Sequence, residues 1–188
     1  MSGRDPLVSA DWLLAEIASP DVSVLDAPWV PPFLKNRPDG KSCYQSGHIA
    51  GASYFDIDDI AATSTGLTQM FRAMGHEEVY VLDGGLAAWK AAGGDIETNP
   101  TTPTPQDFTA KHRPILVREQ AAMREHVDQA DFRILDARAQ GRFDGTSPEP
   151  RADLPSGHMP GSFCVPATAL ISEDGTMLSK SELSISGC

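Results

Sequence analysis

Basic residues and long apolar runs are both scarce in this sequence. Lys and Arg number 15 against 26 Asp and Glu, and the formal net charge is −11. A chain this acidic argues against nucleic acid or an anionic membrane as a partner. No run approaches the ~20 apolar residues of a membrane span, and Met1–Pro6 lacks the basic-then-apolar pattern of a signal peptide. We therefore expect a cytoplasmic protein that binds neither membranes nor nucleic acid.

Cysteine is also rare. Cys43, Cys164 and Cys188 are odd in number and widely spaced, which indicates reduced thiols and not a disulfide framework. No Cys-x-x-Cys or His-x-x-x-His spacing indicates a metal site, and we expect no cofactor. The length of 188 residues allows one or two domains.

The sequence repeats itself at a fixed offset. Leu-Asp-Ala at residues 25–27 precedes Ser-Gly-His at 46–48, and the same two phrases return at 135–137 and 156–158, an offset of 110 residues in both cases. A fixed period indicates duplicated units. Because this period is the size of a domain, we predict two tandem copies of one fold. Residues 97–114, with prolines at 100, 103 and 105, are predicted to be an extended linker between domains 1–96 and 115–188.

Short apolar segments alternate with stretches of helical periodicity. This alternation predicts an α/β fold with parallel sheets flanked by helices. Residues 28–47, rich in Pro and Gly, are predicted to be a loop. Strands are expected at Val22–Leu25 (buried), Ser53–Phe55, Val79–Leu82, near Ile115 and at Phe132–Leu135. Helices are expected after Ser9, at Leu67–Met74 with Met70 and Met74 in the core, at Leu86–Ala92, at Glu119–Val127 and after Ser179.

A polar loop rich in arginine separates Phe132–Leu135 from the apolar run Phe163–Val165. Residues 133–151 contain four arginines and three carboxylates, so the net charge of this segment is +1. Guanidinium groups bind carboxylates bidentately, and a small anion is one natural ligand. The alternative is a solvated loop whose arginines pair with nearby carboxylates. The residues alone leave both interpretations open.

These phrases together resemble the rhodanese family, and their duplication resembles the two-domain sulfurtransferases that use 3-mercaptopyruvate or thiosulfate. The resemblance begins with strand-Leu-Asp-Ala followed by Gly-His-Ile/Met-x-Gly-Ser/Ala. Further phrases of this kind are Tyr54-Phe55-Asp56-Ile57-Asp58, Val81-Leu82-Asp83-Gly84-Gly85-Leu86-Ala87-Ala88-Trp89 and Gly141-Arg142-Phe143-x-Gly145-Thr146-x-Pro148-Glu149-Pro150-Arg151.

The resemblance implies roles for four residues. Arg142 and Arg151 would hold the substrate carboxylate, as arginines so placed do in the mercaptopyruvate branch. Asp39 and His48 would correspond to a relay directed toward the active loop. The alternative for His48 is that it fixes its loop by hydrogen bonding, as His158 would in the second copy, and we favour this because both copies carry the histidine.

The sequence also departs from the family pattern. The catalytic cysteine of the family opens a loop after a later strand of the second domain, and none of the three cysteines has that setting. The first copy is short, because the family would place another strand and its loop between Ile60 and Met70. We therefore expect a sulfurtransferase by descent, truncated and internally shortened, that is inactive or nearly so. Its partners would be 3-mercaptopyruvate or thiosulfate as donor and a thiol or cyanide as acceptor. The alternative is a non-catalytic rhodanese-like module that binds an anion or a protein.

Overall fold

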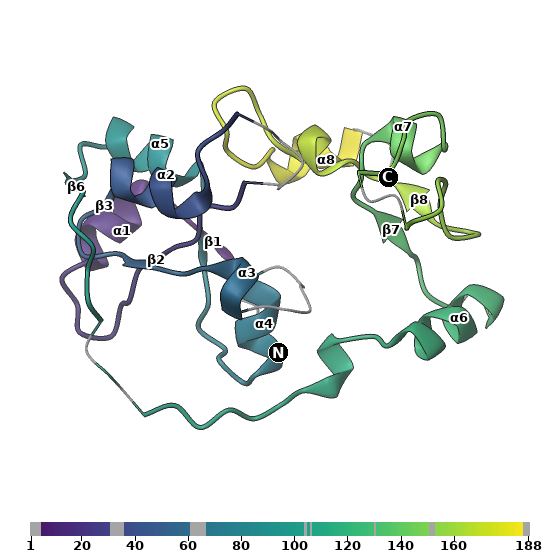
Figure 1. The fold of residues 1–188 in the computed structure, drawn as a ribbon, viewed down its shortest axis with the longest axis horizontal. Coiled ribbons are helices and arrows are strands. Elements are labelled where there is room, and N and C mark those ends of the chain that lie inside the picture. Colours follow the sequence, from purple (N-terminus) through teal and green to yellow (C-terminus); the bar gives the residue numbers. More distant parts are fainter. Residues whose placement is uncertain are drawn as a thin grey trace. The chain divides into compact units, whose positions relative to one another are not determined.

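The computed structural model describes residues 5–30, 36–60, 67–103, 105, 107–129, 131–150 and 153–185 (Figure 1). The chain divides into two compact units, Met1–Leu116 and Val117–Cys188, here called the first and second units. The segment 97–114, predicted as a linker, falls within the first unit. Its residues Lys111 and Arg113 donate backbone hydrogen bonds to the carbonyls of Met74 and Ala73.

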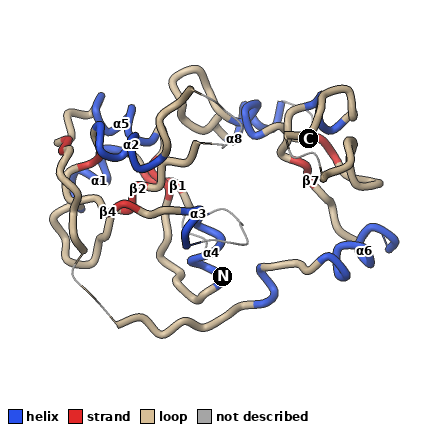
Figure 2. Tube along the Cα trace, in the orientation of Figure 1, coloured by secondary structure: helices blue, strands red, loops and turns tan. Residues whose placement is uncertain are grey.

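All named strands are two residues long, and Figure 2 shows them as short segments between loops and helices. The strands are β1 (Leu7–Val8), β2 (Leu25–Asp26), β3 (His48–Ile49), β4 (Ser53–Tyr54), β5 (Val81–Leu82), β6 (Ile96–Glu97), β7 (Leu135–Asp136) and β8 (Phe163–Cys164). The α-helices are α1 (Ala10–Glu16), α2 (Gly40–Ser46), α3 (Ile57–Ile60), α4 (Leu67–Ala73), α5 (Gly85–Ala91), α6 (Gln120–Gln129), α7 (Gln140–Phe143) and α8 (Lys180–Ile185). Two 3₁₀ helices, η1 (Pro114–Leu116) and η2 (Ala167–Leu170), complete the described elements.

Parallel pairing dominates these strands. In the first unit β1 pairs with β5 and β2 with β4, and in the second unit β7 pairs with β8, all in parallel. The antiparallel pair β3–β6 is the exception among them. Parallel strands need crossover connections, which here contain helices. The predicted α/β class with parallel sheets and flanking helices is therefore confirmed.

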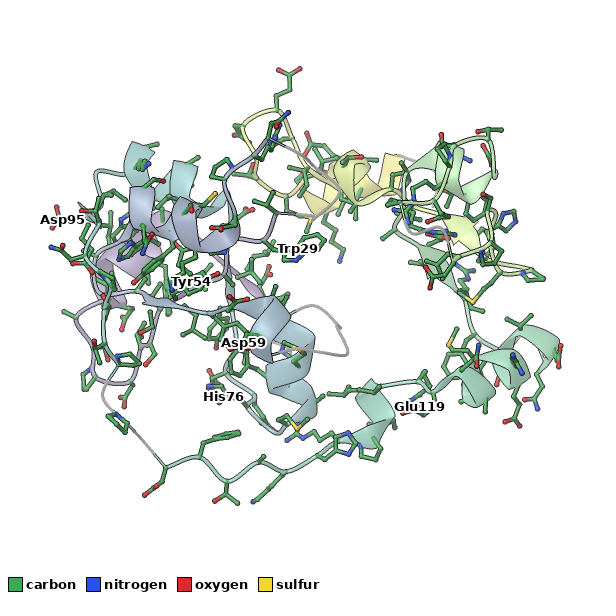
Figure 3. All side chains as sticks on the ribbon, viewed as in Figure 1. Trp29, Tyr54, Asp59, His76, Asp95 and Glu119 are labelled. Carbon is green, nitrogen blue, oxygen red and sulfur yellow. The ribbon has the colours of Figure 1, made fainter. Side chains whose placement is uncertain are left out.

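The core lies in the first unit, where α1, β3 and α5 meet. Leu13, Ile49, Ala52 and Trp89 form its buried cluster. The Trp89 indole Nε1 donates to the carbonyl of Asp95 at 2.9 Å, and Asp95 is labelled in Figure 3. A Cβ on Gly94 would lie 2.0 Å from the Trp89 ring, so only glycine fits beneath this side chain. In the described part of the second unit no residue is buried to the same degree.

Several predicted elements agree with the structure. Ser9 caps α1, because its hydroxyl accepts from the Trp12 amide at 3.1 Å. Helix α4 ends before Gly75, which has a φ of 95° and therefore the left-handed conformation that stops helices. None of the helices that the structure describes is both long enough and apolar enough to cross a membrane.

Other predictions about the elements are wrong. The strand expected near Ile115 is the 3₁₀ helix η1, and Ile115 is 71% exposed. The buried strand expected at Val22–Leu25 is only Leu25–Asp26, and Leu25 is exposed, because β4 is the one described strand that pairs with β2. Met74, expected in the core, lies exposed after the end of α4. Strand β1 was not predicted, since two apolar residues before a helix cap carry too little periodicity.

The predicted loop at 28–47 contains helix α2. Its N-cap is Asp39, whose carboxylate accepts from the Ser42 amide at 2.7 Å. Asp39-Gly40 resembles a turn signal, but Asp is equally favoured as a helix cap. The helix also carries Cys43, which was expected in a polar loop.

Candidate functional site

The arginine loop begins where β7 ends, at Asp136. Arg138 donates to this carboxylate through Nε and Nη2, with Nε–Oδ1 and Nη2–Oδ2 distances of 2.9 and 2.5 Å. Its Nη1 reaches Oε1 of Glu149 at 2.8 Å, and Nη2 also donates to the carbonyl of Gly157 at 2.7 Å. One guanidinium thus ties the strand end to two distant parts of the loop.

Arg142, on the short helix α7, pairs with the same glutamate. Its Nε lies 3.2 Å and its Nη2 2.5 Å from Oε2 of Glu149. The Glu149 side chain is 2% exposed, whereas that of Arg142 is 31% exposed. Asp136, Arg138, Glu149 and Arg142 therefore form a chain of alternating charges, here called the charge ladder.

The charge ladder shifts the ionisation of its members. Hydrogen bonds from Arg138 lower the pKa of Asp136, and those from Arg142 lower the pKa of Glu149. Hydrogen bonding to Asp136 raises the pKa of Arg138. Each carboxylate is therefore fixed in its charged form, and the four charges cancel.

The contacts of the described arginines can be compared with the two interpretations of this loop, the anion-binding site and the solvated loop. Arg138 and Arg142 do pair with nearby carboxylates, as the solvated-loop interpretation requires. Arg151, the second arginine of the predicted clamp, lies outside the described residues, so the clamp stays a prediction. Sequence reasoning missed Arg138 and Glu149 as parts of the site, although their alternation of charge over residues 136–149 was a usable signal.

His48 and His158 make the same two kinds of contact in the two units, although His48 is buried and His158 is exposed. His48 is stacked on Tyr44 with ring centroids 3.6 Å apart, and its Nδ1 lies 2.8 Å from the Tyr44 carbonyl. His158 is stacked on Phe143 at 3.7 Å, with Nδ1 2.8 Å from the Phe143 carbonyl. Because a carbonyl only accepts, Nδ1 carries the proton in both rings. Each histidine thus fixes its loop by the kind of hydrogen bond that the favoured interpretation describes.

Asp39 and His48 do not contact each other. Asp39 caps the start of α2, and His48 follows its end, so the helix separates them by roughly 12 Å at 1.5 Å per residue. The carboxylate near the His48 ring is Glu97 of β6, with Nε2 and Oε1 3.5 Å apart. Hydrogen bonds from the Gly51 amide and the Thr101 hydroxyl lower the pKa of Glu97. The structure does not bring the predicted relay pair together.

Two cysteines, Cys43 and Cys164, lie among the described residues. Cys164 lies on β8 with its Sγ 3.7 Å from the carbonyl of Arg138, and burial together with Asp136 raises the pKa of its thiol. Cys43 lies within α2, where its Sγ is 3.8 Å from the carbonyl of Pro38. A nucleophilic cysteine needs amide donors or positive charge that lower its pKa. Cys188 lies outside the described residues.

The fold of the chain is that of the rhodaneses. It matches SseA from Escherichia coli, a rhodanese-fold 3-mercaptopyruvate sulfotransferase, with a TM-score of 0.82 and 25% sequence identity, over 97% of this chain and 82% of that one. The Tum1 protein of Saccharomyces cerevisiae shares the fold with a TM-score of 0.78 over 95% of this chain and 77% of that one, at 22% identity. No protein-family model matches the chain.

Sequence comparison gives the family. Thiosulfate/3-mercaptopyruvate sulfurtransferase 2 of Arabidopsis thaliana is 32% identical over 243 residues, which cover 97% of this chain and 70% of that protein. Human 3-mercaptopyruvate sulfurtransferase is 30% identical over 222 residues, covering 94% of this chain and 74% of the human protein. The chain belongs to the thiosulfate/3-mercaptopyruvate sulfurtransferase family. Both alignments are longer than the 188 residues of the chain, so both contain internal positions that this chain does not fill.

Proposed function

We propose that the chain descends from a two-domain sulfurtransferase of the 3-mercaptopyruvate/thiosulfate type and that these 188 residues do not catalyse the transfer themselves. In the reaction, a thiolate attacks the transferable sulfur of the donor. An S–S bond forms as the bond from that sulfur to the rest of the donor breaks. The resulting persulfide then passes its outer sulfur to a thiol or to cyanide. The donor would be 3-mercaptopyruvate, whose carbon leaves as the enolate and takes up the proton of the former thiol to give pyruvate, or thiosulfate, which leaves sulfite with the electron pair of the broken S–S bond.

One observation carries the proposal of inactivity. Cys164, the described cysteine of the second unit, has its Sγ 3.7 Å from the carbonyl of Arg138, and the pKa of its thiol is raised and not lowered. A thiol that stays protonated at neutral pH is a poor nucleophile.

The domain organisation is part of the same proposal. Residues 1–96 and 115–188 would be two rhodanese-like copies, with 97–114 between them. The gaps in the alignments with relatives support an internal shortening, which the sequence pattern assigns to the region between Ile60 and Met70. The acidic charge argues against nucleic acid and anionic membranes as partners, and the three widely spaced cysteines favour a cytoplasmic protein.

The remaining function of the second unit would be to bind the donor carboxylate through Arg142 and Arg151. Arginine is suited to this because its planar fork matches two carboxylate oxygens. The proposal that the chain is a non-catalytic anion-binding module is favoured by the same residues, since Arg142 is partly exposed while its partner Glu149 is buried. Among the described residues, no comparable observation supports the binding of a protein ligand.

Activity and binding are tested separately. We expect no pyruvate release from 3-mercaptopyruvate and no thiocyanate from thiosulfate and cyanide above the background without protein. Turnover that disappears in Cys164→Ser or Cys188→Ser, but not in Cys43→Ser, would show that the chain is an active enzyme. In calorimetric titration, pyruvate should bind weakly to the wild type and not measurably to Arg142→Ala or Arg151→Ala. Equal binding to all three would refute the carboxylate clamp.

A further inference from the structure

Glu149 stands between the two arginines of the charge ladder and contacts both. Its Oε1 accepts from Nη1 of Arg138 at 2.8 Å, and its Oε2 accepts from Nη2 of Arg142 at 2.5 Å. A carboxylate with a 2% exposed side chain is tolerated only when opposite charges and donors satisfy its oxygens. Here the two guanidinium groups supply both.

Arg142 uses only one edge of its guanidinium on Glu149. The edge consists of Nε and Nη2, and no described residue hydrogen-bonds the remaining nitrogen, Nη1. The guanidinium is rigid and planar, so holding one edge fixes the direction of the other. With the side chain 31% exposed, a ligand in solvent can reach the group.

Glu149 is itself held from the opposite side. Arg138 is anchored by the Asp136 carboxylate and the Gly157 carbonyl, so it presents Nη1 to Glu149 from a fixed position. The orientation of Arg142 therefore depends on a chain of contacts that starts at the end of β7.

We propose that Glu149 is the positioning residue of Arg142: it holds the Nε/Nη2 edge and leaves Nη1 as the nitrogen that meets the carboxylate of a ligand. This role rests on the proposed carboxylate site. Glu149 itself does not contact the ligand, since both of its oxygens are occupied by arginine.

The test is arginine side-chain ¹H–¹⁵N NMR on the full chain, free and with pyruvate as the probe. The free wild type should give a slowly exchanging Nε–H signal for Arg142, because this proton is hydrogen-bonded to Glu149. Glu149→Gln should broaden or remove that signal while the Nε–H of Arg138 persists, because Asp136 still holds it. Pyruvate should then bind about threefold to tenfold more weakly, the cost of ordering one freed arginine side chain.

Two further variants control for charge and for folding. Glu119, which is exposed before α6 and labelled in Figure 3, provides the matched control: Glu119→Gln removes the same charge and should leave the Arg142 signal and pyruvate binding unchanged. Glu149→Asp keeps the charge but is too short to reach both arginines, so it should shift the Arg142 signal even if Glu149→Gln fails to fold.

The outcomes separate this role from the site on which it rests. An Arg142 signal that is absent in the wild type, or unchanged in both Glu149 variants while pyruvate binding still requires Arg142, overturns the positioning role alone. Equal pyruvate binding by the wild type and Arg142→Ala overturns the carboxylate site and the positioning role together.

Discussion

The two units share a sequence phrase but differ in their cores. Ile49 follows the first Gly-His pair and is 6% exposed, whereas Met159, its counterpart at the offset of 110, is 42% exposed. All the residues that the structure records as buried lie in the first unit. The histidines before these two positions nevertheless have the same stacking and the same hydrogen bond.

Contacts between residues close in the sequence are thus present in both units, whereas the buried core depends on residues distant in the sequence. The histidine contacts join residues 4 and 15 positions apart, so each loop forms them locally. The core around Ile49 needs β6, which pairs with β3, and α5, which supplies Trp89. The described part of the second unit contains no equivalent of either element, and its turns form without a buried centre.

The largest effect is expected from removing the centre of the first core. Trp89→Ala should lower the free energy of unfolding of the first unit by about 3–5 kcal/mol, because a large buried side chain leaves a cavity. Urea unfolding followed by circular dichroism measures this. Trp29→Ala is the matched control, since Trp29 is exposed and its loss should cost about 1 kcal/mol or less. Equal losses for both variants would mean that the cluster around Trp89 is not the core.

A smaller effect compares equivalent helices directly. Leu13 of α1 is buried in the cluster, and its counterpart at the offset of 110 is Met123 of α6, which is only half-buried. Leu13→Ala should cost about 2–4 kcal/mol and Met123→Ala less than about 1 kcal/mol. Hydrogen exchange resolved by segment should show faster exchange throughout the first unit in the former and little change in the latter. A large effect of Met123→Ala would reveal a second core.

The smallest effect concerns the aspartates that end β2 and β7. Burial raises the pKa of Asp26, whereas hydrogen bonds from Arg138 lower the pKa of Asp136. The residue that corresponds to Arg138 in the first copy is Pro28, which has no charge to offer. At the same position of the repeat, the pKa of the aspartate is thus raised in the first unit and lowered in the second.

The sign of each contribution follows from these shifts. Asp136 stabilises above its unfolded pKa of about 4, and this contribution is lost as the pH falls through its lower folded pKa. Asp26 does the reverse, because its ionisation becomes unfavourable as the pH rises from about 4 through its higher folded pKa. At pH 7, Asp136→Asn should cost about 1–2 kcal/mol after allowance for screening, whereas Asp26→Asn should be neutral or slightly stabilising. Unfolding at pH 7 and at pH 3 measures both, and the same sign at pH 7 would contradict the comparison.

Local signals in the sequence predicted much of the fold. The cap at Ser9 and the stop at Gly75 were predicted correctly, and the helix predicted at Leu86–Ala92 is observed at Gly85–Ala91. Each of these features depends on residues within one or two turns. The α/β class and the family followed from alternation and from the repeated phrases. The short strand β1 could not be found, because it is defined by its pairing with β5, more than seventy residues away.

The candidate site was predictable in its composition but not in its connections. The sequence shows that arginines and carboxylates gather after Asp136, but several pairings are possible among them. Only the structure shows that Glu149 is shared by Arg138 and Arg142. The position of Asp39 relative to His48 was unpredictable for a similar reason, since it depends on whether the intervening residues form a helix.

The stacked histidines also give each unit a spectroscopic reporter. A ring lying 3.6–3.7 Å above an aromatic neighbour experiences that neighbour's ring current, so the carbon-bound protons of His48 and His158 should resonate upfield of ordinary histidine positions. The two signals arise from different units and different partners, Tyr44 and Phe143. One spectrum of the intact chain can therefore follow the formation of each loop separately during unfolding.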